Sequence, residues 1–144
     1  LILCHEIVPA VNQMECHLFC QQKELRAFEE RYGIKMMAWA PFAEGREGIF
    51  VNPVLADIGG HFEKTPAQVI LRWLMQRDIV AVAKSTHVER MKENLDIFDF
   101  QLTDAQMQQI AQLDTGTSLF FDHQTPETVD QFVEMIAQRR ADFT

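Results

Sequence analysis

Short apolar runs alternate with helical patterns along the chain. Three of these runs are too short for helices and are predicted to be buried strands: residues 8–14, 34–42 and 79–83. Between the second and the third run, apolar side chains recur at helical spacing: Val69, Ile70, Trp73 and Leu74. Strands that alternate with helices pair in parallel through right-handed crossovers, so the pattern predicts an α/β fold.

Start signals locate the helices. Thr65 and Thr103 each precede a glutamine by three residues, and Thr86 precedes Glu89 by the same spacing. All three pairs have the capping-box pattern, in which both side chains bond backbone amides of the first turn. Together with the other start and stop residues, these signals predict helices over about 21–32, 54–62, from 65, from about 87, over 103–113 and over 127–139.

Polar and aromatic residues gather where the predicted strands end. Gln13 ends the first strand, residues 39–42 end the second, and residues 84–86 follow the third. The carboxyl ends of parallel strands form ligand sites in doubly wound sheets and in (β/α)8 barrels, and the pattern is compatible with either. No Gly-x-Gly-x-x-Gly follows a strand, which disfavours the dinucleotide-binding sheet, whereas barrels often bind phosphate after their late strands.

The segment 82–94 carries the densest set of anion-binding groups. Lys84 and Ser85 precede the predicted helix start at Thr86, and Arg90 lies one turn inside the helix. Free amides and the positive end of the helix dipole, with an ammonium, a guanidinium and two hydroxyls beside them, suit a dianionic phosphate. On this pattern alone, a phosphate site and an ordinary capped helix with a solvated basic face are equally favoured interpretations.

Composition narrows the classes of partner. The chain has 144 residues, 47% of them hydrophobic, which suffices for one globular core. A net charge of -8 argues against a nucleic-acid partner, because phosphate backbones require clustered basic residues. Every apolar run is shorter than the roughly 18 residues that a membrane span needs, so no membrane partner is expected. An odd number of cysteines, three, argues against a disulfide framework and favours a cytoplasmic protein.

Several motifs in register resemble one family. They are PAVNQMECH at 9–17, AWAPF at 38–42, QVILRW at 68–73 and AKS at 83–85, followed by Arg90 and Glu93-Asn94. In order and spacing they resemble the carboxyl-terminal half of the aldo-keto reductases over about residues 5–122. The ending SLFFDH at 118–123 resembles the bacterial diketogluconate reductase and morphine dehydrogenase branch of that family. The resemblance implies that residues 1–144 are part of a (β/α)8 TIM barrel, namely strands 6–8 with a helical tail from about 115.

The same resemblance implies an oxidoreductase that uses NADP(H) to reduce the carbonyl group of a small aldehyde or ketone. It implies that Gln13 bonds the nicotinamide carboxamide, that Trp39 stacks on the nicotinamide ring, and that the loop with Ala40 and Phe42 passes the pyrophosphate. A flat apolar ring against one face of the cofactor leaves the other face free for hydride transfer. Without the family, a core aromatic would be the favoured interpretation of Trp39.

At the other end of the cofactor, the resemblance assigns six contacts. The residues that match the 2′-phosphate positions are Lys84, Ser85, Thr86 and Arg90, and those that match the adenine positions are Glu93 and Asn94. These positions coincide with the anion site expected from residues 82–94. The resemblance therefore favours phosphate binding over the solvated basic face.

No catalytic residue is assigned to this chain. The family's catalytic tyrosine, lysine, aspartate and histidine belong to the first half of the barrel. The only tyrosine, Tyr32, precedes a helix stop at Gly33 and is expected to be a packing or surface residue. A structural role is favoured for His17 over a place beside the substrate. Cys16, His17 and Cys20, with Cys4 and His5, match no zinc spacing, and no metal is expected.

Two functions of different classes fit the sequence. In the first, the parent protein is an NADPH-dependent carbonyl reductase, and this chain is its cofactor-binding half. In the second, the chain is a non-catalytic half-barrel module that binds a nucleotide or a partner. Open edges of a parallel sheet need covering, either by the rest of a barrel or by a second copy of the chain.

Overall fold

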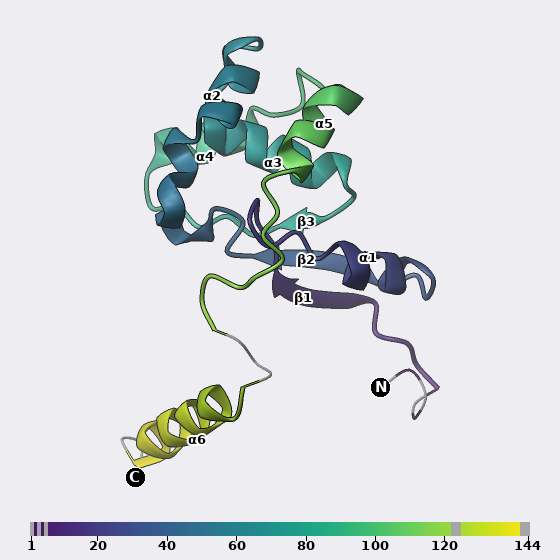
Figure 1. Cartoon of the computed structure of the whole chain (residues 1–144), viewed down its shortest axis with the longest axis vertical. Coiled ribbons are helices and arrows are strands. Elements are labelled where there is room, and N and C mark those ends of the chain that lie inside the picture. Colours follow the sequence, from purple (N-terminus) through teal and green to yellow (C-terminus); the bar gives the residue numbers. More distant parts are fainter. Residues whose placement is uncertain (1, 3, 5, 122–124, 142–144) are drawn as a thin grey trace.

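The sheet contains three parallel strands in chain order. The computed structural model describes residues 2, 4, 6–121 and 125–141. Strands β1 (Val11–Glu15), β2 (Lys35–Trp39) and β3 (Val80–Ala81) lie side by side, and both pairs are parallel (Figure 1). Each connection between strands contains at least one helix. The predicted α/β fold with parallel pairing is confirmed.

The helices follow the predicted pattern, with ends shifted by at most two residues. They are α1 (Lys23–Glu30), α2 (Pro53–Gly60), α3 (Pro66–Gln76), α4 (Val88–Leu95), α5 (Asp104–Ala111) and α6 (Pro126–Ala141), and the loop after β2 contains the 3-10 segment η1 (Ala43–Val51). The strands differ more from the prediction. The prediction that Gln13 ends the first strand is wrong. Strand β1 runs on to Glu15, so Gln13 lies in the middle of the strand.

The capping-box prediction is confirmed at Thr65 and Thr103 and is wrong at Thr86. In both confirmed cases, the threonine Oγ1 accepts from the amide three residues later, and the glutamine side chain accepts from the threonine amide. Helix α4 begins one residue later than predicted, with His87 as its N-cap and no side-chain cap bond. The hydroxyl of Ser85 accepts from the His87 amide at 3.1 Å, and this local turn replaces the cap.

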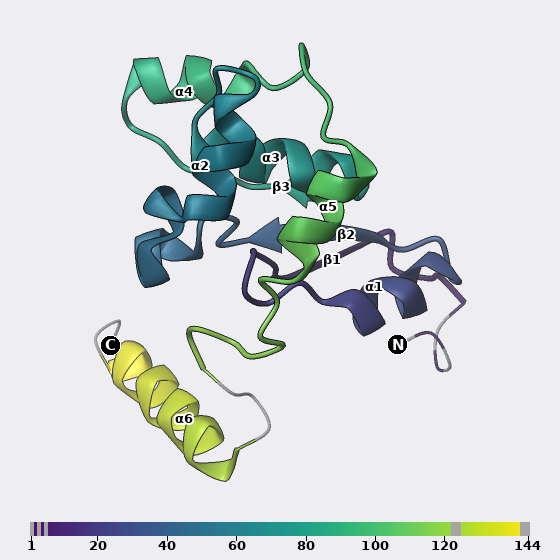
Figure 2. The same cartoon turned by 45° about the horizontal axis from the view of Figure 1, so that its top comes forward.

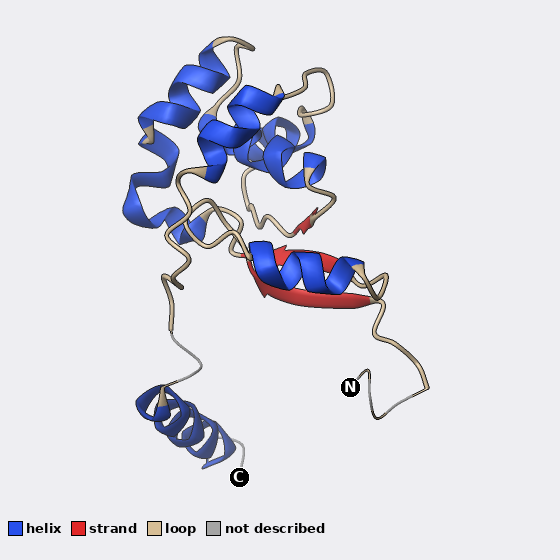
Figure 3. Cartoon of the chain, turned by 45° about the vertical axis from the view of Figure 1, so that its right-hand side comes forward, coloured by secondary structure: helices blue, strands red, loops and turns tan. Residues whose placement is uncertain are grey.

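Helices cover one face of the sheet. Met36 and Ala38 on β2 are buried in the core, whereas the intervening Lys35, Met37 and Trp39 are partly exposed. The predicted apolar stripe of α3 belongs to the same core. Helices α2 to α5 form one group beside the strands (Figure 2), and α1 lies along the sheet (Figure 3). The strand face that carries Trp39 is therefore the less covered one.

Helix α6 lies apart from the sheet and from the other helices in all three views (Figures 1 to 3). The ring of Phe132 on α6 meets the ring of Phe121 edge-on, with 5.0 Å between the centroids. Among the described residues, no helix has both the length and the apolar character that crossing a bilayer requires.

Candidate functional site

Most of the predicted 2′-phosphate and adenine residues line a single cavity of about 490 Å³, here called the basic cavity. The predicted residues in its wall are Phe42, Lys84, Ser85, Arg90, Glu93 and Asn94, and the wall is completed by Phe50, Thr65, Pro66 and Ala67. The end of β2, the start of α3 and the helix α4 thus meet at one ligand-sized space. Thr86 is exposed and is not part of this wall.

Two cations in the basic cavity have no partner within the described chain. The side chains of Lys84 and Arg90 form no hydrogen bond or ion pair with any described residue. Ser85, by contrast, is engaged locally, because its hydroxyl also donates to the His87 carbonyl at 3.2 Å. Both cations lie near the amino-terminal end of α4, where the helix dipole adds positive potential. The cavity is therefore suited to an anion.

Helix α4 is fixed to the start of α3 by polar contacts. Thr65 Oγ1 donates to Glu93 Oε1 at 2.6 Å, and Lys64 Nζ lies 2.8 Å from a carboxylate oxygen of both Asp96 and Asp99. The hydrogen bond to Asp96 is the largest cause that raises the pKa of Lys64, and the hydrogen bond to Asp99 is the second. The bond from Lys64 in turn lowers the pKa of Asp99. The wall of the basic cavity is consequently held at the carboxyl-terminal end of α4.

Gln13 and Trp39 line a second cavity, of about 900 Å³, which we call the strand-end cavity. Its wall combines the carboxyl end of β1 with a later segment, through Glu15, Ser118 and Phe121; Met14, Cys20, Gln22, Gly116 and Thr117 also line it. The predicted site residues therefore fall into two groups. Those implied to hold the nicotinamide and those implied to hold the phosphate lie in different cavities.

A turn after β2 connects the two groups along the chain. Trp39 lines the strand-end cavity and Phe42 lines the basic cavity, with Ala40 between them. Ala40 has a φ of 50°, in the left-handed region that a β-carbon disfavours, and its carbonyl accepts from the Ala43 amide at 2.8 Å. The turn therefore lies where the middle of a ligand spanning both cavities would pass.

Trp39 packs against aromatic residues that follow α5 by several residues. The centroid of its ring is 4.9 Å from that of Phe120 and 6.2 Å from that of Phe121, and the Phe121 ring is tilted from it by only 26°. One side of the indole is thus occupied by the chain itself. Trp39 is partly exposed rather than a core aromatic.

Sequence reasoning missed Glu15, a buried carboxylate beside Trp39. His17 is fully buried, and its Nδ1 accepts from the Phe19 amide at 3.2 Å. The remaining proton is therefore on Nε2, which donates to Glu15 Oε1 at 2.8 Å. Burial lowers the pKa of His17, in agreement with a neutral ring and with the predicted structural role. A carboxylate at the end of an apolar strand, two residues before a histidine, was the available signal.

The cysteines are free thiols, and the tyrosine has the packing role expected of it. Burial raises the pKa of Cys20 to about 11, so its thiol stays protonated at neutral pH. Within the described residues, which include Cys4 but not His5, no three His, Cys, Asp or Glu side chains form a group able to hold a metal. Tyr32 is exposed and packs on Phe28, with 5.1 Å between ring centroids.

Comparison with known proteins gives consistent matches. The sequence profile of the aldo/keto reductase family matches residues 49–115. Morphine 6-dehydrogenase of Pseudomonas putida is 39% identical over 147 residues, which cover 94% of this chain and 49% of that protein. The chain spans about half the length of the curated relatives that it matches.

Solved structures are similar over most of the chain. An aldo-keto reductase from a Medee basin deep-sea metagenome library matches with a TM-score of 0.81 and 32% identity, over 85% of this chain and 45% of that one. A Bombyx mori aldo-keto reductase, solved in complex with NADP, matches with a TM-score of 0.77 and 30% identity, over 85% of this chain and 42% of that one. Because these neighbours are (β/α)8 barrels, the predicted fold class, the carboxyl-terminal part of such a barrel, is confirmed.

Proposed function

The chain belongs to the aldo/keto reductase family, and from this premise we propose that it is the cofactor-binding half of an NADPH-dependent reductase of aldehydes or ketones. The observation that carries the proposal is the basic cavity. Lys84 and Arg90, which form no ion pair with any described residue, line a space of about 490 Å³ beside a helix start. Cations that line a cavity and have no partner among the described residues are available to an anionic ligand, and a 2′-phosphate is the anion that distinguishes NADPH from NADH.

The residues of the strand-end cavity fit the opposite end of the same cofactor. Gln13 carries both an amide donor and a carbonyl acceptor, which matches the two polar groups of a carboxamide. Trp39 offers one side of its indole, the other being packed against Phe121. When bound, NADPH supplies the hydride that reduces the carbonyl carbon of the substrate. The relative from Bombyx mori that was solved with NADP supports this choice of cofactor.

The proposal assigns each end of the cofactor to one of the two cavities. Lys84 and Arg90 bind the 2′-phosphate, with the Ser85 and Thr86 hydroxyls beside them, and Glu93 and Asn94 contact the adenine. Ala40 and Phe42 lie in the turn along which the pyrophosphate passes. The proposed proton donor is a tyrosine outside this chain, because Tyr32 is exposed at the end of α1 and away from both cavities. A cytoplasmic location belongs to the proposal, since Cys4, Cys16 and Cys20 are all free thiols.

The proposal is tested with the longer protein that contains this chain and with the 144 residues alone. The longer protein should oxidise NADPH only when an aldehyde or ketone is present, and should use NADH poorly. The chain alone should bind NADPH without turnover. Turnover by the chain alone would place the catalytic groups within it, and failure of the longer protein to bind NADPH would reject the proposed function.

A second candidate is a non-catalytic half barrel that pairs with another copy of itself. It is favoured by the apolar side chains at both open sheet edges, where Val11 and Val80 are 46% and 41% exposed. Sedimentation of the 144-residue chain separates the two functions. A tight dimer that binds NADPH without any carbonyl-dependent activity of the longer protein would favour the half barrel.

A further inference from the structure

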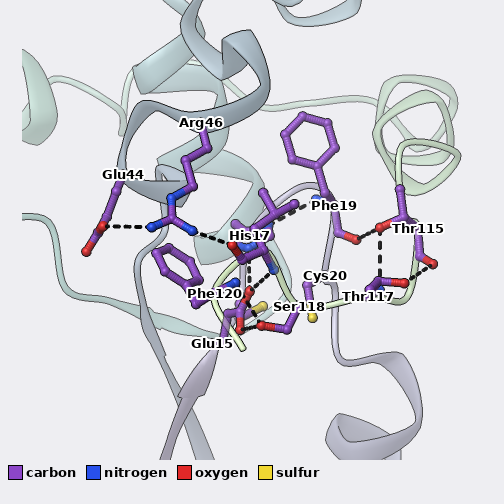
Figure 4. Close-up of polar contacts among 12 residues, drawn as sticks. Glu15, His17, Phe19, Cys20, Glu44, Arg46, Thr115, Thr117, Ser118 and Phe120 are labelled. Atoms are coloured by element: carbon purple, nitrogen blue, oxygen red, sulfur yellow. Dashed lines mark hydrogen bonds and ion pairs between the residues drawn. The ribbon is translucent and has the colours of Figure 1, made fainter. Parts of the chain in front are cut away.

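Residues 114–121, here called the strap, lie across the carboxyl end of β1 (Figure 4). The carbonyl of Phe19 accepts both from the Thr115 amide at 2.9 Å and from the Thr115 hydroxyl at 2.8 Å. Asp114 Oδ1 accepts from the Gln21 amide at 3.1 Å. The beginning of the strap is therefore bound to the loop that follows β1, although about a hundred residues separate the two in sequence.

The hydroxyl of Ser118 connects Glu15 to the aromatic end of the strap. It donates to Glu15 Oε2 at 2.6 Å and accepts from the amides of Phe120 at 3.0 Å and Phe121 at 3.1 Å. A hydroxyl has one donor and two acceptor sites, so Ser118 is fully used. Its position sets the backbone of both phenylalanines.

Glu15 is a fixed point for this connection. It is 6% exposed, and Oε1 accepts from the Leu119 amide at 3.0 Å as well as from His17. A buried carboxylate that accepts three hydrogen bonds has little freedom to move, and charge-assisted bonds of this kind are stronger than neutral ones. The side chain thus ties the strap to the last residue of β1.

The far side of the strap is held by η1. The guanidinium of Arg46 donates to the Leu119 carbonyl, and its central carbon lies 4.2 Å from the centroid of the Phe120 ring. A cation over an aromatic face is attractive. Phe120 is consequently fixed between Arg46 and Trp39, and Phe121 stacks on the same indole.

We propose that Glu15 and Ser118 are positioning residues for Trp39: through Phe120 and Phe121 they fix the indole that receives the nicotinamide end of the cofactor. The proposal rests on the proposed function of the chain. Neither residue needs to touch the cofactor for this role. Their effect should be larger at the strand-end cavity than at the basic cavity, because the two cavities share no lining residue.

Two ligands separate the two ends of the site in the longer protein. NADPH engages both cavities, whereas 2′,5′-ADP carries the adenine and the 2′-phosphate but no nicotinamide. Ser118→Ala should weaken NADPH binding about five- to tenfold, which is the size expected for the loss of one hydrogen bond. The dissociation constant of 2′,5′-ADP should change by less than about twofold. Calorimetry or fluorescence titration measures both dissociation constants without turnover.

Matched variants control for the loss of a hydroxyl. Thr103→Ala removes an exposed hydroxyl that caps α5 and lines neither cavity, so it should change the affinity for neither ligand. Ser118→Thr keeps the hydroxyl and should restore NADPH binding. Glu15→Gln keeps an acceptor for His17 and Leu119 and should be milder than Glu15→Ala. Hydrogen exchange should show faster exchange at the Phe120 and Phe121 amides in Ser118→Ala than in Thr103→Ala.

The outcomes are distinct. Unchanged NADPH affinity in Ser118→Ala, or an equal loss for NADPH and 2′,5′-ADP, would overturn the positioning role. Slow exchange of both phenylalanine amides in Ser118→Ala would overturn it as well. If the unmodified protein binds 2′,5′-ADP and NADPH equally weakly, at millimolar concentrations, the proposed function itself fails, and the positioning of a cofactor fails with it.

Discussion

The basic cavity and the strap show two opposite uses of charge in one small chain. Lys84 and Arg90 have no partner among the described residues, whereas the Glu15 carboxylate accepts from His17, Ser118 and Leu119. A charge that the fold leaves unpaired is available to a ligand, and a charge that the fold satisfies completely holds structure in place. The first region is therefore expected to respond to mutation in binding, and the second in position and stability.

The largest expected effect is on binding at the basic cavity. Arg90→Ala in the longer protein should raise the dissociation constant of NADPH about 10- to 100-fold, since hydrogen bonds to charged groups contribute about 1.5–3 kcal/mol. NADH, which lacks the 2′-phosphate, should bind with nearly unchanged affinity. Lys92→Ala is the matched control, because Lys92 is an exposed cation on the same helix that does not line the cavity. If the affinity for NADPH falls equally in both variants, Arg90 contributes only general positive charge and does not bind the 2′-phosphate.

These two regions also differ in how far the sequence predicted them. Lys84, Arg90 and Glu93 lie within ten residues of one another, so a strand followed by a helix start is enough to bring them together. Glu15 and Ser118 are separated by 103 residues, and no local pattern indicates that they bond. Periodicity predicts elements and their order, whereas long-range polar pairs depend on how loops cross the sheet.

Local competition explains the errors that remained. Thr86 has a good capping sequence, yet the Ser85 hydroxyl bonds the His87 amide first and moves the helix start by one residue. Gln13 was predicted at a strand end because polar residues usually mark ends, but β1 continues to Glu15, whose carboxylate is satisfied by the strap. In both cases a polar side chain found a partner that single-sequence propensity does not include.

The hydrogen-bonded region around Glu15 should make the stability of the protein depend on pH through His17. Burial lowers the pKa of His17 below the ordinary value of about 6.5, so below that value the unfolded chain binds a proton that the folded one does not. The contribution of His17 to stability is therefore complete above about pH 6.5 and is lost as the pH falls below it. Protonation would also place a hydrogen on Nδ1, which accepts from the Phe19 amide.

Urea unfolding of the longer protein between pH 7.5 and pH 5 measures this dependence. His17→Gln should flatten it relative to the unmodified protein, whereas His61→Gln, at an exposed histidine on the surface, should not. Parallel curves for all three proteins would show that His17 does not couple folding to pH and would weaken its assignment as the neutral partner of Glu15.

The smallest expected effect joins the two kinds of region, because Thr65 both caps α3 and donates to Glu93 in the basic cavity. Thr65→Ala and Thr103→Ala should each lower the free energy of unfolding by about 1 kcal/mol, as both remove a capping box. Only Thr65→Ala should also raise the dissociation constant of NADPH, by about two- to threefold, because Glu93 loses the bond that fixes it beside Lys84 and Arg90. If both variants weaken NADPH binding equally, the effect comes from lower stability in general, and the contact between Thr65 and Glu93 does not position the wall of the cavity.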